Sequence, residues 1–195
     1  LFAVLIIAFS SYQAFVVPGQ NQEVEFTHNQ EVHSDMQDVR NAIVSAPDGG
    51  NSRSVSVQLG TQYPSRAIAR NPGPASGSLR TVGTTDESAA LSIENAQASG
   101  ETGDFWNDSQ SYNTGTLRYT PQYNLYTQAP STVYENTILY NEFRSGSITL
   151  ANQTFIDGND ISLVVLNGSV SRSSSQSASL DIQPVSSSTQ TVRLS

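Results

Sequence analysis

The hydrophobic and polar positions follow three different patterns along the chain. Residues 1–17 are almost continuously apolar, interrupted only by a Ser-Ser-Tyr-Gln run at 10–13. The next segment, up to residue 46, repeats apolar side chains at steps of four, three and four, which is one face of an amphipathic helix. These side chains are Val32, Met36, Val39 and Ile43. From residue 51 onward, short and often alternating runs are separated by turn residues, as in all-β sandwiches.

The first apolar segment has three alternative uses: a cleaved signal peptide, a membrane anchor, or a helix that packs against copies of itself. At about 1.5 Å per residue it would form a helix of roughly 25 Å, slightly shorter than the ~30 Å hydrocarbon core of a bilayer. No Lys or Arg precedes the apolar run, which disfavours a signal peptide. We therefore expect the segment to be retained, with a kink or break at Pro18 and Gly19.

The second segment is expected to be a helix with an acidic, solvent-facing side, ending in the Ala-Pro-Asp-Gly-Gly sequence at 46–50. His28 and His33 are the only histidines, and five positions place them about 140° apart around the helix. Because they cannot face one ligand, we interpret both as solvated surface residues. The acidic residues, set against Arg40, are Glu23, Glu25, Glu31, Asp35 and Asp38.

Eight β-strands are predicted in the remainder of the chain, so the fold class is α+β with an antiparallel β-sandwich. A hairpin turn is expected at Asp157–Asp160, because Asp-Gly tolerates positive φ. Two stretches, 70–80 and 98–113, are expected to be loops. The predicted strands are 54–60, 89–96, 115–121, 131–143, 146–156, 160–168, 177–185 and 189–195. The division is therefore a helix at 1–46 and a β domain at 51–195.

The composition limits the partners. The net charge is −8 and all nine basic residues are Arg, so there is no concentrated basic patch for nucleic acid. An acidic chain without Lys is typical of proteins from salt-loving archaea, where high ionic strength screens carboxylate repulsion. Cysteine is absent, so stability must come from the core, bound ions or assembly rather than disulfides.

Sequence motifs for reaction chemistry are missing. Without Cys, thiol catalysis and thiolate zinc sites are excluded. The turn Asp157–Asp160 resembles part of a calcium loop, but the full spacing and the closing Glu are missing, so we favour a plain turn. We expect no enzyme activity and no cofactor.

Three N-x-Ser/Thr sequences could carry glycans if the β domain is outside the cell. They begin at Asn107, Asn152 and Asn167. All three lie in the β domain and none lies in the N-terminal helix.

This order of segments resembles type IV pilins, particularly archaeal ones, and the Lys-free composition favours a haloarchaeal type. The resemblance is carried by Leu1–Val17, Pro18 and the amphipathic Glu23–Ile43 segment. It implies a membrane anchor that later forms the core of a filament, and a solvent-facing immunoglobulin-like domain that carries glycans. The first acidic residue is Glu23, whereas many pilins have a Glu close to the mature N-terminus. The Gly- and Ala-rich opening of archaellins is also missing, which favours adhesion over motility.

The resemblance predicts an extracellular homo-oligomer, a helical filament of identical subunits, with a membrane-inserted stage before assembly. The alternative is a membrane-anchored cell-surface binding protein whose β domain acts alone. The side chains expected to pack in the filament core are Phe2, Leu5, Ile6, Phe9, Tyr12, Phe15 and Val16.

Overall fold

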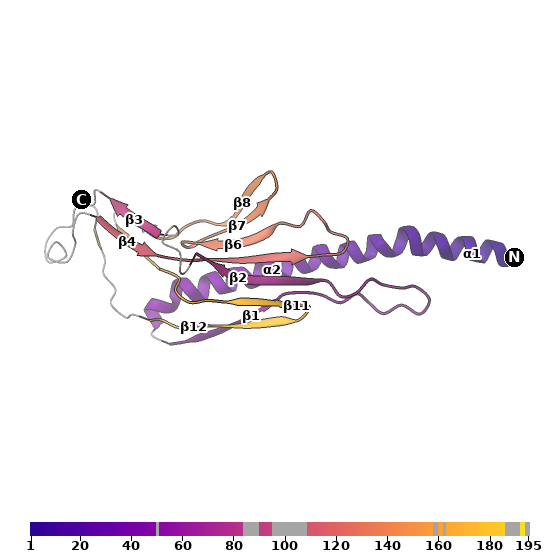
Figure 1. Ribbon diagram of the computed structural model, residues 1–195, viewed down its shortest axis with the longest axis horizontal. Coiled ribbons are helices and arrows are strands. Elements are labelled where there is room, and N and C mark those ends of the chain that lie inside the picture. The colour runs from indigo at the N-terminus through magenta and orange to yellow at the C-terminus, as the bar shows by residue number, and fades with distance from the viewer. Residues whose placement is uncertain are drawn as a thin grey trace.

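A computed structural model of the chain describes residues 1–49, 51–83, 90–94, 109–157, 160–161, 163–185 and 192–193. The molecule is elongated, with one long helix that is enclosed by β-strands along its C-terminal half and projects from them along its N-terminal half (Figure 1). One helix followed by antiparallel sheets confirms the α+β class.

The helix is continuous from residue 2 to residue 49. It comprises α1 (Phe2–Ser11), a π-helical segment η1 (Tyr12–Val16) and α2 (Val17–Gly49). The helix continues through Pro18, and the irregular turn lies directly before it. Proline has no N–H and cannot donate a hydrogen bond to the preceding turn. In the π-helical segment directly before Pro18, the Val17 N–H donates to the Tyr12 carbonyl, five residues back. The chain therefore passes the proline without ending the helix.

The largest sheet has six strands in the order β11-β2-β5-β6-β7-β8, all antiparallel. Smaller sheets pair β1 with β12, β3 with β4, and β10 with both β9 and β13. The strands are β1 (Arg53–Gln58), β2 (Ser76–Val82), β3 (Ala90–Glu94), β4 (Ser109–Asn113), β5 (Thr116–Gln122), β6 (Ser131–Glu135), β7 (Ile138–Phe143), β8 (Gly146–Ala151), β9 (Ile156–Asp157), β10 (Asp160–Ile161), β11 (Ser171–Ser174), β12 (Ser177–Ile182) and β13 (Val192–Arg193).

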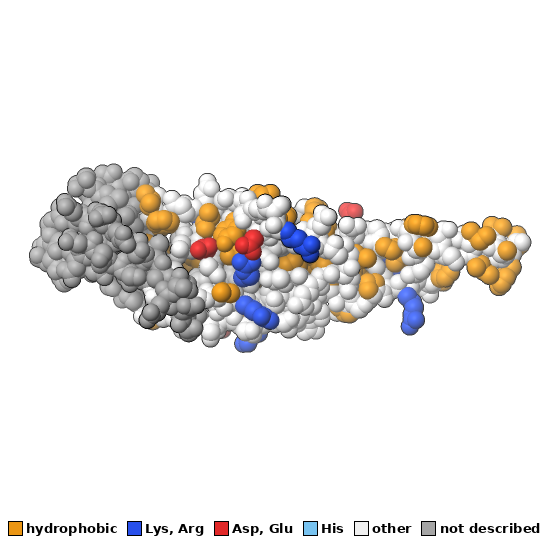
Figure 2. Space-filling view, turned by 45° about the horizontal axis from the view of Figure 1, so that its top comes forward, with side chains coloured by type: hydrophobic (Ala, Val, Ile, Leu, Met, Phe, Trp, Pro, Cys, Tyr) orange, Lys and Arg blue, Asp and Glu red, His pale blue; other side chains and the backbone are white. Residues whose placement is uncertain are grey.

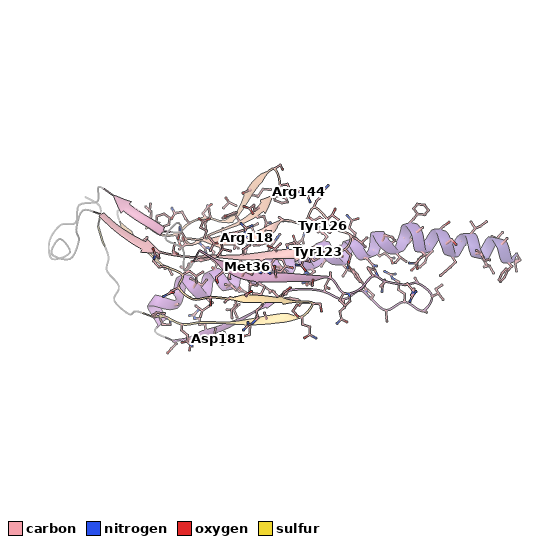
Figure 3. The ribbon with its side chains drawn as sticks, in the orientation of Figure 1. Met36, Arg118, Tyr123, Tyr126, Arg144 and Asp181 are labelled. Atoms are coloured by element: carbon pink, nitrogen blue, oxygen red, sulfur yellow. The ribbon has the colours of Figure 1, made fainter. Side chains whose placement is uncertain are left out.

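The core forms where α2 packs on β1, β12, β6 and β7. The predicted apolar face of the helix is confirmed: its four side chains are buried and lie in one cluster with side chains from the sheets. Met36 is at the centre of this region (Figure 3). The sheet side chains of the cluster are Val57, Leu59, Leu79, Leu117, Tyr119, Tyr134, Leu139 and Leu180.

The buried stripe of α2 is longer than the apolar pattern predicts. It extends toward the N-terminus as far as Val17, directly before Pro18. The added buried residues are Val17, Asn21, Glu25 and His28, again at steps of four, four and three. The expectation of an exposed acidic side is therefore wrong for Glu25, which has no exposed surface. The interpretation of His28 as a solvated residue is also wrong, and His33 is half-buried. A pattern read from apolar residues alone misses buried polar positions.

Both predicted loops and several predicted strands differ in part from the structure. The stretch at 70–80 is not all loop, because β2 begins at Ser76 and forms the second strand of the large sheet. Its small residues look like turn residues, yet they are required by packing. A Cβ on Gly77 would lie 2.4 Å from the Leu59 carbonyl oxygen and 2.6 Å from the ring of Tyr119. At 160–168 only β10 is a strand, and residues 163–168 are irregular.

The run at 131–143 is a hairpin of β6 and β7, not a single strand. Its turn residues Asn136 and Thr137 have positive φ values of 44° and 70°, and the sequence lacks the glycine that usually marks such a turn. Likewise the predicted loop at 98–113 ends in β4, which pairs with β3. The pairing of β9 with β10 confirms the hairpin at 156–161.

We predict that Met36→Ala lowers the free energy of unfolding by about 2–5 kcal/mol, the usual cost of removing a large side chain from a packed core. The measurement is chemical denaturation of the whole chain in detergent micelles. Gln37→Ala, at the exposed neighbouring position, should change the free energy by much less. Equal effects of the two substitutions would contradict the packing of this helix face.

Candidate functional site

The projecting part of the helix is apolar and exposed on every side. No residue of α1 is buried, and Phe2 and Phe15 are each 78% exposed. Hydrophobic side chains therefore cover the thin end of the molecule (Figure 2). Contiguous exposed apolar surface of this kind marks an interaction site with protein or membrane.

By length and composition this helix could cross a membrane. A core helix of similar composition in a soluble protein would be mostly buried, whereas only 6% of the most apolar 18-residue window is buried here. Six of the seven side chains expected to pack in a filament core are exposed: Phe2, Leu5, Ile6, Phe9, Phe15 and Val16. The seventh, Tyr12, is half-buried and accepts a hydrogen bond from Arg66 at 3.3 Å.

Glu25 holds the β domain onto the helix through a cluster of hydrogen bonds. Its carboxylate accepts from three consecutive backbone N–H groups, those of Asn124 at 2.7 Å, Leu125 at 2.8 Å and Tyr126 at 2.5 Å. The hydroxyl of Tyr63 also donates to it. A buried carboxylate is costly unless its lone pairs are satisfied, and here four donors converge on it. The segment after β5 and the segment after β1 are thus fixed to one helical position.

The aromatic side chains around Glu25 form one connected group. His28 Nδ1 lies 2.6 Å from the hydroxyl of Tyr123, whose ring stacks with that of Tyr126. Tyr126 in turn contacts the edge of Phe26 on the helix. Tyr123 and Tyr126 lie at the end of the β domain that faces the exposed helix (Figure 3). Burial lowers the pKa of His28 and so favours the neutral imidazole beside Tyr123.

A second connection lies nearer the exposed end. The guanidinium of Arg66, from the segment between β1 and β2, donates to Tyr12, Gln20 and Asn21 of the helix. The side chain of Gln13 makes two hydrogen bonds with the backbone of Arg70. These contacts involve Tyr12 and Gln13 of the polar run, whereas Ser10 and Ser11 are exposed.

Arg40 connects the other end of α2 to the sheet. Its Nε donates to the Thr137 carbonyl at 2.6 Å and its Nη2 to the Asn152 carbonyl at 2.8 Å.

Both sequons that the structure describes begin at exposed asparagines, Asn152 and Asn167, whereas Asn107 lies outside the described residues. The two described asparagines are thus accessible to a modifying enzyme.

No group of three or more His, Cys, Asp or Glu side chains that could hold a metal ion occurs among the residues that the structure describes. The side chains of the Asp157–Asp160 turn, the possible calcium loop, lie outside that description.

Comparison with known proteins gives one distant archaeal relative. An uncharacterized protein of Archaeoglobus fulgidus is 22% identical over 188 residues, which cover 95% of this chain and 31% of that protein. The chain therefore spans about a third of the length of this relative. No protein-family model matches the chain, and no solved structure matches it.

The residues that fix the helix to the β domain do not follow from the apolar pattern of the sequence. Glu25 is one of the acids expected to be exposed, although its spacing of seven residues from Val32 places it on the buried face. Tyr63, Arg66 and Arg70 stand in a loop with no pattern that links them to the helix. Only their contacts in the folded chain show what they do.

We predict that Glu25→Gln lowers the free energy of unfolding by on the order of 3 kcal/mol, since hydrogen bonds to a charged group contribute about 1.5–3 kcal/mol each. A glutamine has one carbonyl oxygen, and its amide group would face backbone N–H donors. Denaturation and amide hydrogen exchange at Asn124–Tyr126 measure the effect. Glu23→Gln is the matched control on the exposed side. Equal stability of the two variants would refute this role of Glu25.

We also predict a loss of stability in alkali. Burial raises the pKa of Tyr63 and of Tyr123 to about 12, whereas an unfolded tyrosine loses its proton near pH 10. Below pH ~10 both states keep the proton and stability is unaffected. As pH rises from about 10 to about 12, only the unfolded chain ionises, so stability falls.

Denaturation midpoints and tyrosinate absorbance across that range test this prediction. Tyr63→Phe should make the decline with pH shallower, whatever its effect at neutral pH. Ionisation of every tyrosine near pH 10 with no loss of stability would be the contrary result.

Proposed function

We propose that the protein is a structural subunit of an extracellular filament of the archaeal type IV pilus kind, assembled through its N-terminal helix. The observation that carries the proposal is the uninterrupted helix, apolar and exposed on all sides at one end and locked into a β domain at the other. Apolar surface exposed all round suits a position among several like helices.

The energetics favour such packing. At ~25 cal/mol per Å², burial of several large side chains per subunit gives on the order of 10 kcal/mol before ordering costs. A heterologous interface joins different surfaces of two copies, and when its rotation does not close a ring it generates an open helical filament. The free energy of burial is then gained again with each subunit added. Ser10 and Ser11, both exposed, supply hydroxyl groups that can hydrogen-bond in such a core.

The rigid connection supports a filament over a simple anchor. No flexible linker separates the apolar helix from the β domain, and Glu25, Arg66 and Arg40 fix the domain along the helix. A membrane anchor works equally well through a loose linker. In a filament, by contrast, each domain must occupy a fixed position relative to its core helix.

The finer features of the proposal follow from the same resemblance. We propose membrane insertion before assembly, a role in surface attachment, glycans at Asn152 and Asn167, and function at high salt. The distant relative from an archaeon supports the archaeal assignment. We also propose that the β domain is an immunoglobulin-like sandwich, with β1–β12 and the six-stranded sheet as its two layers and α2 packed along both.

The second candidate function is a membrane-anchored cell-surface binding protein. The helix that is long enough to cross a membrane favours it. Under this alternative the chain stays monomeric in detergent and forms no filaments on the cell surface.

We predict that Ile6→Asp abolishes filaments on cells that produce the chain from its natural gene, because it places a carboxylate in the apolar core. Electron microscopy of the surface material is the measurement. Ile148→Asp on β8 is the matched control, since the two isoleucines are 51% and 60% exposed. Filaments should persist in the control. Two results would contradict assembly through this helix. One is filaments in both variants, and the other is the absence of filaments from both the control and the unsubstituted chain.

A further inference from the structure

The segment between β1 and β2 forms a closed loop that lies along the helix. Thr61 and Ala75 pair at its base through two backbone hydrogen bonds of 3.1 and 3.0 Å. Three prolines in residues 61–75 restrict its backbone. Figure 1 shows this loop reaching further toward the N-terminus than any strand of the β domain.

The loop is fastened to the helix where the exposed apolar segment begins. Gln13 Nε2 donates to the Arg70 carbonyl at 2.9 Å, and Gln13 Oε1 accepts from the Arg70 N–H at 3.1 Å. Arg66 adds bonds from its guanidinium to Asn21 at 3.1 Å and, within the loop, to Asn71 at 3.2 Å. The position of the loop relative to the apolar helix is therefore fixed.

The outer turn of the loop, residues 67–69, is apolar, with Ala67 and Ile68 exposed and Ala69 half-buried. Its sequence is Ala-Ile-Ala, and Ile68 is 72% exposed. The side chain of Arg70, at its border, is also exposed. Gln13 binds only the backbone of Arg70, so the backbone of Arg70 is fixed while its guanidinium stays available to solvent or to a ligand.

The charge around this turn differs from that of the whole chain. Although the net charge is −8, residues 59–85 contain no Asp or Glu, and neither do residues 1–22. Two of the nine arginines stand within five positions here. The loop itself is thus basic and free of carboxylates, and the first acids on the helix are Glu23, which is exposed, and Glu25, which is buried.

We propose that residues 67–69 rest in the headgroup region of a phospholipid membrane while the apolar helix is inserted, with Arg70 contacting lipid phosphate. Apolar side chains beside arginine suit this interface, where the side chain is shielded from water and the guanidinium binds phosphate oxygens. A second copy's apolar helix would accept Ile68, but residues 1–22 offer no carboxylate to Arg70. This inference rests on the membrane-inserted stage of the proposed function.

The absence of cysteine allows the experiment. Ile68→Cys, Phe2→Cys and Ser147→Cys are each labelled with a polarity-sensitive fluorophore. The whole chain is then reconstituted in vesicles of phosphatidylcholine and phosphatidylglycerol that contain nitroxide lipids. We expect the label at 68 to shift its emission to the blue and lose intensity to headgroup nitroxides. The label at 2 should be quenched by deep nitroxides, and the label at 147 should stay aqueous.

A matched pair of variants tests the arginine. In the Ile68→Cys background, Arg70→Gln should reduce quenching at 68, whereas Arg144→Gln on the β7–β8 turn should not. An equal response of both variants would overturn the phosphate contact.

The other outcomes separate the two proposals. A label at 2 quenched deep in the bilayer with an aqueous label at 68 overturns the loop contact and leaves membrane insertion intact. A label at 68 that shifts only in assembled filaments also overturns it, and assigns the turn to a subunit contact. Aqueous labels at both positions overturn the membrane stage itself and, with it, this inference.

Discussion

The fold depends on one buried carboxylate on the long helix. Glu25 has no exposed surface, and three consecutive backbone N–H groups and the Tyr63 hydroxyl donate to it. An ionised group in such a position is tolerated only because its acceptor capacity is filled. The same bonds satisfy amide groups in a segment that has no strand partner there. The helix and two separate segments of the β domain are thereby stabilised together.

This interaction determines how the apolar end is presented. The helix supplies four of the twelve side chains in the main core cluster, so the β domain and the helix fold as one body. Arg40 and Arg66 add hydrogen bonds on either side of Glu25 along the helix. Because the helix is continuous from the core to the exposed segment, the packing of the domain sets the direction of the apolar helix.

The sequence predicts the apolar parts of this structure and not the polar ones. Val32, Met36, Val39 and Ile43 repeat at helical spacing, so their burial follows from the pattern. Strand β5 is likewise close to its predicted bounds. Strand β2 is missed because Gly77 and its serine neighbours have turn-like composition, and the need for small residues becomes evident only once Tyr119 packs over them. The turn at Asn136 and Thr137 is missed because it lacks glycine.

The polar positions of the buried stripe also explain why the helix has one register. An apolar stripe alone could slide by one turn, about 5.4 Å, and still bury similar side chains. A shift of four residues would bring Asn21 or Asn29 to the three N–H donors at 124–126, and a shift of three would bring His28 or Gln22, whose amide, like that of asparagine, has one carbonyl oxygen. An asparagine offers a single carbonyl oxygen and a neutral histidine a single acceptor nitrogen, so either would leave buried N–H groups without partners. Glu25 alone among these side chains has two charged oxygens, so its register is favoured. The length of apolar helix that projects from the domain is therefore the same in every copy, a constancy that the proposed filament of identical subunits requires in order to repeat one contact.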